Sequence, residues 1–311
     1  MKPLCMYLAL LLALGTFLVS DAAGESRIES RDRDTEFVGW VDPDKLYWRP
    51  FIISGLPEAQ FKLLSFSEST RARSQITELP AGWRHPEGYH NTNEEIFVLS
   101  GDLTVGGEKM SKYSYAYYPA GYVHGPAYSE YGATLLHWWD GDPDFEASQE
   151  SNPNTRLDEV VEDWNYYDQP WTDEKDFPRW AEVMPPPGTF HLKLLRKDKV
   201  TGAMTWINSA AGGGTIGGPE IWEVHPSWEE SMLLEGELTY GECLPQGEVV
   251  GKYKAGDYFF RPANIRHGGR SAYSDTYMLF IFRTSAPIWA DYYSECNNPP
   301  EEKSAKKGEA K

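Results

Sequence analysis

The feature that most constrains this chain is a pattern of glycine, histidine, glutamate and proline that occurs twice. Each copy contains His-x3-Glu-x6-Gly and, further along, Pro-x-(Gly or Asn)-x2-His. The first copy comprises Gly82, Gly88, His90, Glu94, Gly101, Pro119, Gly121 and His124, and the second comprises Gly217, Glu223, His225, Glu229, Gly236, Gly256, Pro262, Asn264 and His267. Four of the seven histidines in the chain lie on this pattern. Such a repeat indicates a chain built from two similar halves.

The residues around both copies are typical of β-strands. Segments 94–107, 231–241 and 276–284 are rich in β-branched and aromatic residues and are interrupted by glycine. Only residues 156–163 indicate a short helix. Two halves of about 100 residues, each with many short strands, predict an all-β protein of two barrels or double-sheet jelly rolls. The second copy is longer between its glutamate and its last histidine, and we place the insertion in a hairpin around Cys243 to Val250.

Each copy offers two histidines and one carboxylate, a set that suits a divalent first-row metal with open coordination positions. On a strand, residues i and i+2 face the same side, so positions 88 and 90 point into one barrel, as do positions 223 and 225. We predict two metal sites, whose ligands are His90, Glu94 and His124 in the first half and His225, Glu229 and His267 in the second. The alternative is that these histidines are hydrogen-bonded core residues without a metal.

The repeated motif resembles the signature of the cupin superfamily, which is Gly-x5-His-x-His-x3,4-Glu-x6-Gly followed by Gly-x5-Pro-x-Gly-x2-His-x3-Asn. The resemblance covers about Trp40 to Glu295 and implies two tandem cupin barrels, each with a metal held by three histidines and one glutamate in its mouth. The pattern also resembles an uncharacterised group of secreted two-cupin proteins related to the zinc-binding cupin domain of some anti-sigma factors.

The chain departs from the cupin signature at the first histidine of the His-x-His pair, which is replaced by Gly88 and by Glu223. We therefore expect a gap at Gly88 that is open to water or substrate, and we expect Glu223 to be an additional ligand. His85 is near in sequence, but its odd separation from His90 places it on the opposite face of a regular strand, so it is a weaker ligand candidate. Glu95 and Glu230, which follow the motif glutamates, are expected to face solvent.

The resemblance implies one of three functions. The first is a metalloenzyme that uses iron, manganese, nickel or zinc for dioxygenase-like or related chemistry on a small organic substrate, with Tyr115 or Tyr117 as a proton or hydrogen-bond donor. Sugar isomerisation and decarboxylation occur on the same scaffold. The alternative is a non-catalytic protein that binds a metal or a small ligand, or a storage-type bicupin without a metal.

The net charge of −18 argues against a nucleic-acid partner, because a phosphate backbone must be met by lysine and arginine. We expect a small-molecule partner and, since cupins often pair through sheet edges, a homodimer.

The N-terminus has the pattern of a signal peptide, because Lys2 precedes an apolar run from Leu8 to Val19 that is too short to span about 30 Å of hydrocarbon. We expect a secreted or periplasmic protein with no membrane span after cleavage. Cleavage leaves Cys243 and Cys296, which are either bonded to each other or both unpaired. The predicted divisions are a signal peptide at 1–23, a flexible leader at 24–39, barrel 1 at 40–150, an acidic Pro/Trp-rich connector at 151–187, barrel 2 at 188–298 and a disordered tail at 299–311.

Overall fold

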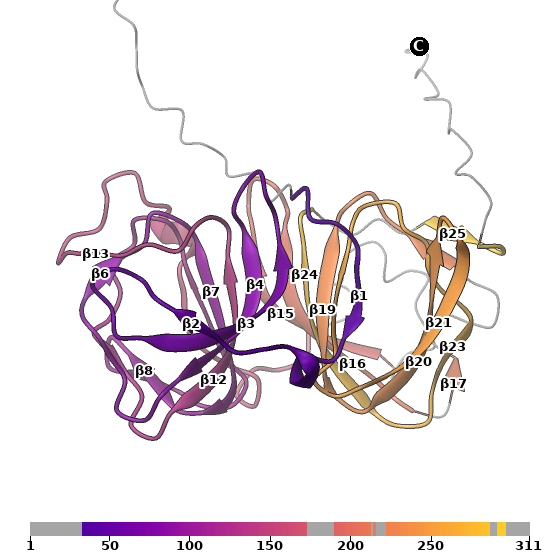
Figure 1. The fold of residues 1–311 in the computed structure, drawn as a ribbon, viewed down its shortest axis with the longest axis horizontal. Helices are drawn as coiled ribbons and strands as arrows, with labels where there is room; N and C mark the ends of the chain where they lie inside the picture. Colours follow the sequence, from indigo (N-terminus) through magenta and orange to yellow (C-terminus); the bar gives the residue numbers. More distant parts are fainter. Residues whose placement is uncertain (1–32, 173–189, 213, 216–221, 287–290, 297–311) are drawn as a thin grey trace, which may run out of the picture.

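The computed structural model describes residues 33–172, 190–212, 214–215, 222–286 and 291–296. These residues form strands and two 3₁₀ turns, η1 (Pro43–Lys45) and η2 (Leu157–Glu159), so the short helix expected at 156–163 is only one turn. The strands build two barrels that stand side by side (Figure 1), which confirms the all-β class. The predicted signal peptide, Gly217, the tail and residues 24–32 of the leader lie outside the described residues. Within the described ranges, no helix has the length and apolar character needed to cross a bilayer.

Barrel 1 consists of a large sheet in the order β14-β10-β7-β12-β4-β3-β2, faced by β5-β11-β8-β9 and by the pair β13-β6. Its strands are β2 (Arg49–Phe51), β3 (Ala59–Phe66), β4 (Arg73–Leu79), β5 (Arg84–His85), β6 (Gly88–Tyr89), β7 (Glu94–Gly101), β8 (Leu103–Val105), β9 (Glu108–Met110), β10 (Ser114–Tyr118), β11 (Ala127–Tyr128), β12 (Ala133–Trp139), β13 (Glu146–Ala147) and β14 (Val161–Asn165).

Barrel 2 consists of the sheet β1-β22-β19-β24-β16-β15 and the sheet β21-β20-β23-β18-β25, with β17 paired to β23. Its strands are β1 (Val38–Val41), β15 (Phe190–Lys197), β16 (Met204–Ala210), β17 (Gly214–Thr215), β18 (Trp222–Val224), β19 (Glu229–Glu235), β20 (Glu237–Leu244), β21 (Gly247–Lys254), β22 (Tyr258–Arg261), β23 (His267–Ser274), β24 (Met278–Thr284) and β25 (Asp291–Tyr293). The hairpin β20–β21 is longer than its counterpart β8–β9, so the insertion lies where the sequence places it.

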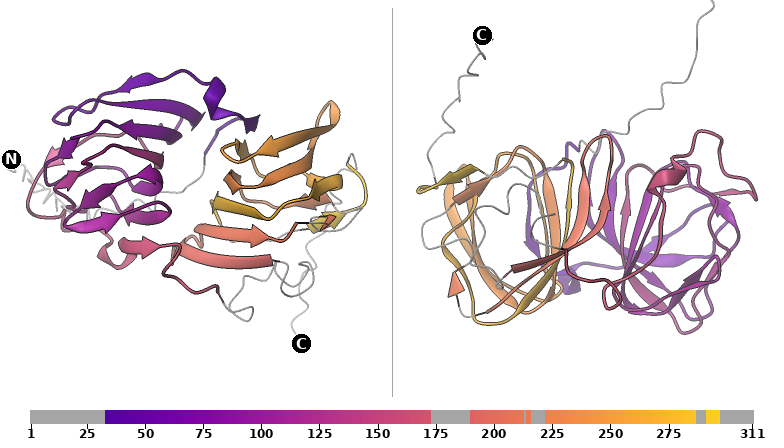
Figure 2. Two further views of the ribbon diagram at one scale, coloured as in Figure 1. Left: turned by 90° about the horizontal axis from the view of Figure 1, so that it is seen from below. Right: turned by 180° about the vertical axis from the view of Figure 1, so that it is seen from behind.

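Strand pairing differs from the predicted domain division at two places. Strand β1, at the end of the predicted leader, pairs with β22 of barrel 2 before the chain crosses to barrel 1 (Figures 1 and 2). Strand β14, inside the predicted connector, pairs with β10 and extends the large sheet of barrel 1. Both segments cover strands that would otherwise be exposed edges, and edge pairing of this kind has no local sequence signature.

Alternation along the strands divides each barrel into an inner and an outer face. On β7, Ile96 and Val98 pack in the interior of barrel 1, whereas Phe97 packs in a core shared with residues of barrel 2 such as Met232 and Phe260. The two large sheets therefore pack face to face, and the shared core lies between the two barrel interiors.

Glu95 and Glu230 lie in this interface, which corrects the expectation that they face solvent. Each is 1% exposed, and Arg283 of β24 donates to both, at 2.8 Å from Nη2 to Glu95 Oε1 and 2.6 Å from Nη1 to Glu230 Oε1. Arg33, within the predicted flexible leader, is also buried and lies 3.4 Å from Glu230 Oε1. Alternation places both glutamates outside their own barrel correctly, but the partner barrel covers that face.

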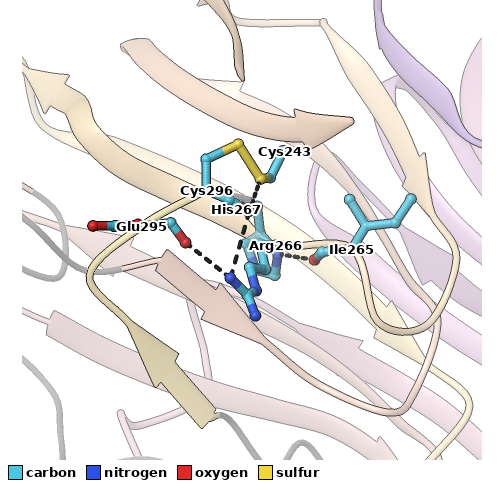
Figure 3. The surroundings of a disulfide bond; sticks show 6 residues. All are labelled: Cys243, Ile265, Arg266, His267, Glu295 and Cys296. Carbon is cyan, nitrogen blue, oxygen red and sulfur yellow. Dashed lines mark hydrogen bonds between the residues drawn. A yellow bond between two sulfur atoms is a disulfide. The ribbon is translucent and has the colours of Figure 1, made fainter. Parts of the chain in front are cut away.

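Cys243 and Cys296 form a disulfide, which settles the two alternatives left open by the sequence. The bond joins β20 to the residues that follow β25, beside the strand that begins at His267 (Figure 3). Arg266 Nη1 adds a hydrogen bond of 2.9 Å to the carbonyl of Glu295. Together these contacts hold the residues that follow β25 against barrel 2, next to the pairing of β25 with β18.

Candidate metal centre

Three buried histidines of barrel 1, His85, His90 and His124, bring one ligand nitrogen each to within 4.8 Å of one another. Each directs Nδ1 at a backbone carbonyl: Pro86 for His85, Asp144 for His90 and Tyr122 for His124. A carbonyl can only accept a hydrogen bond, so each Nδ1 carries the proton. In the neutral imidazole, Nε2 is then unprotonated and free to bind a metal.

Glu94 completes the cluster, because its Oε2 lies 3.2 Å from His124 Nε2 and 3.7 Å from His90 Nε2. This oxygen is buried and has no hydrogen-bond partner. Acceptor atoms with no donor between them repel one another, and an unpaired buried carboxylate oxygen is costly. A cation between these atoms removes both costs, so three histidines and one glutamate fit a divalent metal.

The electrostatics of the cluster favour this protonation state. Burial lowers the pKa of His85 to about 4 and also lowers the pKa of His90, so both imidazoles are neutral near pH 7. Burial raises the pKa of Glu94, but its pKa lies well below the ordinary value, and the hydrogen bond from His137 contributes to this lowering. His85 and His90 are therefore neutral imidazoles beside an ionised Glu94, the forms that bind metals.

His85 is a full member of the cluster, although strand alternation ranked it below the other candidates. The chain does not run as one strand from His85 to His90, because Pro86 and Glu87 separate β5 from β6. The two short strands belong to different sheets, where His85 pairs with Ala127 and Gly88 pairs with Ala147. Because of this turn, the side chain of His85 points toward the cluster. His85 therefore supplies the third histidine, which the cupin signature would place at position 88.

The expected open gap at Gly88 is filled. A Cβ atom on Gly88 would lie 2.3 Å from the carbonyl oxygen of Glu146 and 2.4 Å from the ring of Phe145. The Phe145 ring also contacts His85 edge to face, with centroids 4.6 Å apart. Glycine at this position therefore admits Phe145, which supports the imidazole of His85, and leaves no space for substrate.

Gly88→Ala is expected to destabilise the protein by about 1–3 kcal/mol, because the added methyl group must displace backbone and an aromatic ring. The matched control is Gly39→Ala, whose new Cβ would meet Phe37 at an ordinary 3.5 Å. Urea unfolding of the two variants measures the difference. Equal stability of Gly88→Ala and the wild type would mean that an open gap exists after all.

His137 on β12 is a site residue that the sequence does not reveal, because it lies outside the repeated motif. Its Nε2 donates to Glu94 Oε1 at 2.7 Å, and its Nδ1 lies 3.1 Å from Thr77 Oγ1. Gln75 Nε2 donates in turn to Thr77 Oγ1 at 2.8 Å. This relay orients Glu94 so that Oε2 faces the three histidines.

His137→Leu is expected to lower metal affinity by about 10–100-fold, the usual effect of losing a group that orients a ligand. His137→Gln, whose amide can still donate to Glu94, is expected to lose less. Competition with a metal-binding dye measures both affinities. If His137→Leu binds metal as tightly as the wild type, the relay does not position Glu94.

A cavity of barrel 1 opens onto the cluster, with about 50 Å³ of space for water-sized molecules. That space suits a few waters or one small organic molecule. His85, His90, Glu94, His124 and His137 form its polar end. Its other walls are mainly apolar and include Phe51, Leu56, Trp83, Leu103 and Trp139. None of the described residues that line it is a lysine or an arginine.

The tyrosines proposed from the sequence as proton donors point away from this cavity. Tyr115 donates to Glu95 at 2.9 Å, and Tyr117 packs against Arg196, both on the side that faces barrel 2. Tyr118, the next residue along the strand after Tyr117, lies on the inner face. Its ring stacks on His124 with centroids 4.2 Å apart. Tyr118 therefore replaces Tyr115 and Tyr117 as the tyrosine beside the candidate site.

The turns that carry the last histidines are alike in the two barrels. Gly121 and Asn264 both have positive φ, at 77° and 67°, as expected for a turn that favours glycine or asparagine. In each barrel, the N–H of this residue donates to the carbonyl of the first motif histidine, at 2.8 Å for Gly121 and His90 and 2.9 Å for Asn264 and His225. The turn thus fixes the two histidines relative to each other.

Barrel 2 also brings together His225, Glu229 and His267, whose ligand atoms lie within 4.8 Å of one another. Here, however, Arg261 Nη1 donates to Glu229 Oε2, and His225 Nε2 lies 3.2 Å from the same oxygen. Burial lowers the pKa of His225, but Glu229 outweighs it and raises the pKa. Glu223, expected to be an additional ligand, is not part of this group: its Oε2 lies 4.0 Å from His267 Nε2, and its side chain is 31% exposed.

Comparison with known families and structures supports the fold. The model of a family described as "Domain of unknown function (DUF4437)" matches residues 54–286. Among curated proteins, no match is found.

Many solved structures have similar folds, and two of them are described below. A "putative dioxygenase" from Nostoc punctiforme is 20% identical, with a TM-score of 0.66 over 86% of this chain and 88% of that chain. The oxalate decarboxylase of Lactobacillus farciminis, solved as a formate complex, is 13% identical, with a TM-score of 0.52 over 85% of this chain and 90% of that chain. At these identities the similarity establishes the architecture of two tandem cupin barrels.

Proposed function

Because the chain belongs to the family described as "Domain of unknown function (DUF4437)", whose description carries no activity, we propose a function from the site itself. We propose that barrel 1 is a metal-dependent catalytic centre with dioxygenase-like or related chemistry on a small, uncharged, largely apolar compound. The similarity to the Nostoc "putative dioxygenase" and to an oxalate decarboxylase agrees with an enzymatic role.

The observation that carries this proposal is the unpartnered Oε2 of Glu94. It faces the Nε2 atoms of His90 and His124, and the hydrogen bonds at Nδ1 of those histidines leave both nitrogens as acceptors. A buried set of acceptors without a donor is a site prepared for a cation.

The roles of the residues follow from their contacts. His85, His90 and His124 would bind the metal through Nε2, and Glu94 would bind it through Oε2 and offset part of its charge. A bound iron, manganese, nickel or zinc ion would supply Lewis-acid chemistry or, for iron, oxygen activation. His137 holds Glu94 in place, and Phe145 and Tyr118 pack against the imidazoles of His85 and His124 and restrict their orientation.

The walls of the cavity define the class of substrate. For an anionic compound, the bound metal would be the one positive charge in the cavity, because none of the described lining residues is a lysine or an arginine, and Glu94 would offset part of that charge. An uncharged apolar compound would instead gain contacts with side chains such as Trp83 and Leu103. The small volume restricts the substrate, or the reacting part of it, to a few heavy atoms.

A non-catalytic metal-binding protein is the alternative. It would not need a cavity next to the ligands, so the cavity over His85, His90 and His124 favours the enzyme.

The test is oxygen uptake and product formation by protein loaded separately with iron, manganese, nickel or zinc, using a panel of small neutral and anionic compounds. We expect turnover with neutral apolar compounds and with a redox-active metal. Turnover restricted to carboxylates would contradict the proposed substrate class. Metal-loaded protein that turns over no compound with any metal would favour the binding protein.

The proposed location is outside the cytoplasm. The disulfide between Cys243 and Cys296 supports this, because such bonds persist in oxidising compartments. A signal sequence cleaved near residue 23 should appear in N-terminal sequencing of protein from its host, and an intact Met1 in mature protein would contradict it. A homodimer and a relationship to the zinc-binding cupin domain of anti-sigma factors remain predictions.

A further inference from the structure

Barrel 2 contains a buried arginine beside its histidine–glutamate cluster, at the position where barrel 1 has Tyr118. Arg261 is 1% exposed, and alternation on β22 points it into the barrel. It donates to Glu242 through Nε at 3.0 Å and through Nη2 at 2.6 Å, and its remaining Nη1 donates to Glu229 Oε2. The guanidinium therefore joins two buried carboxylates, one of which is the motif glutamate.

The equivalent positions of the two barrels explain how this difference arises. Arg261 directly precedes the motif proline Pro262, and Tyr118 directly precedes Pro119. In barrel 1 the phenol stacks on His124 and leaves Glu94 Oε2 without a hydrogen-bond partner. In barrel 2 the guanidinium reaches the corresponding glutamate oxygen and satisfies it. The residue before the motif proline is therefore what differs: with Tyr118 the glutamate oxygen has no hydrogen-bond partner, and with Arg261 the corresponding oxygen is already paired.

We propose that barrel 2 holds no metal, because the guanidinium of Arg261 supplies the positive charge at its histidine–glutamate cluster. The chain then binds one metal ion, in barrel 1, and barrel 2 keeps the motif as an internal ion-pair cluster.

The proximity of His225, Glu229 and His267 does not contradict this inference. Their ligand atoms are as close together as those of the barrel 1 histidines, so distance alone permits a metal in either barrel. An ion on Glu229 Oε2 would have to displace Arg261 Nη1 or lie beside it, and two cations on one oxygen repel each other. Moving Arg261 away would also leave Glu242, which is 2% exposed, without its arginine partner.

The experiment is equilibrium dialysis of the full chain against Mn²⁺ or Zn²⁺, followed by elemental analysis. Wild-type protein is expected to hold one ion per chain and to keep it in His225→Ala. The double variant Arg261→Met/Glu242→Gln removes the guanidinium together with its second carboxylate partner and is expected to hold two ions. Adding His225→Ala to that variant should return the content to one.

Two matched variants isolate the role of the charge. Glu242→Gln alone leaves Arg261 on Glu229 and should stay at one ion per chain. Arg261→Lys keeps a positive charge at the same place and should also stay at one. A circular dichroism melt of each variant shows whether the fold is retained. If the double variant does not fold, the comparison of wild type with His225→Ala still decides the question.

Two ions in wild-type protein, one of them lost in His225→Ala, would overturn the inference. A folded double variant that remains at one ion would overturn it as well, since something other than Arg261 would then exclude the metal. The same variants made in a chain that also carries His90→Ala, which removes a ligand of barrel 1, separate this inference from the proposed function. If barrel 1 binds no metal, wild type holds none, but the double variant still gains one ion that depends on His225.

Discussion

Replacing His85 with alanine is expected to lower the affinity of the protein for a divalent metal by more than about 100-fold and to abolish metal-dependent turnover. The loss of a group that only orients a ligand costs about 10–100-fold, and the loss of a ligand should cost more. His85 contributes one of the three nitrogens that lie within 4.8 Å of one another, and the residue at the cupin ligand position, Gly88, has no side chain. Isothermal titration with Zn²⁺ or Mn²⁺ measures the change.

His191→Ala is the matched control, because His191 contacts Trp171 and lies outside both clusters. It should bind metal as the wild type does. His90→Ala should lose as much affinity as His85→Ala. If His85→Ala retains wild-type affinity while His90→Ala loses it, the centre is the smaller set of His90, Glu94 and His124, and the fourth ligand inferred here is wrong.

Arg283→Ala is expected to lower the free energy of unfolding by about 3–5 kcal/mol, because it removes the guanidinium that pairs with buried carboxylates of both barrels. Arg283 is 1% exposed and joins Glu95 and Asp140 of barrel 1 to Glu230 of barrel 2. Urea unfolding monitored by tryptophan fluorescence measures the loss. The triple variant Arg283→Ala/Glu95→Gln/Glu230→Gln also removes two of the carboxylate charges that Arg283 pairs with. It should recover part of the lost stability.

Arg71→Ala is the control for this prediction. Arg71 forms ion pairs with Asp142 and Glu68, but its side chain is 48% exposed, so its removal should change stability by no more than about 0.5 kcal/mol. Equal effects of Arg283→Ala and Arg71→Ala would mean that the charges between the barrels contribute little to holding them together.

Much of the fold follows from the sequence, because the repeated motif and the two-residue period act locally. The spacing of His90, Glu94 and His124 predicts residues that the structure places on the inside of one barrel. Asn264 and Gly121 take the positive φ that their turn requires. The same period puts Glu95 on the outside of its barrel, but it carries no information on what covers that outside, and there the prediction failed.

The candidate site was only partly predictable for a similar physical reason. His85 joins the cluster because a turn at Pro86 breaks the strand. Strand alternation, which placed His85 on the opposite face from His90, therefore does not apply between the two residues. Gly88 is filled by Phe145, a residue distant in sequence that is brought close by the pairing of β13 with β6. His137 and Arg261 both lie on strands whose inward face could be assigned, but their partners Glu94 and Glu229 emerge only from the three-dimensional arrangement.

We propose one metal centre per chain, formed by His85, His90, His124 and Glu94. X-ray diffraction from metal-soaked crystals, with data collected at the absorption edge of the metal, tests it most directly. We expect one anomalous peak per chain, within bonding distance of the three Nε2 atoms and of Glu94 Oε2. A peak between His225 and His267, or a barrel 1 peak that does not contact His85, would contradict it.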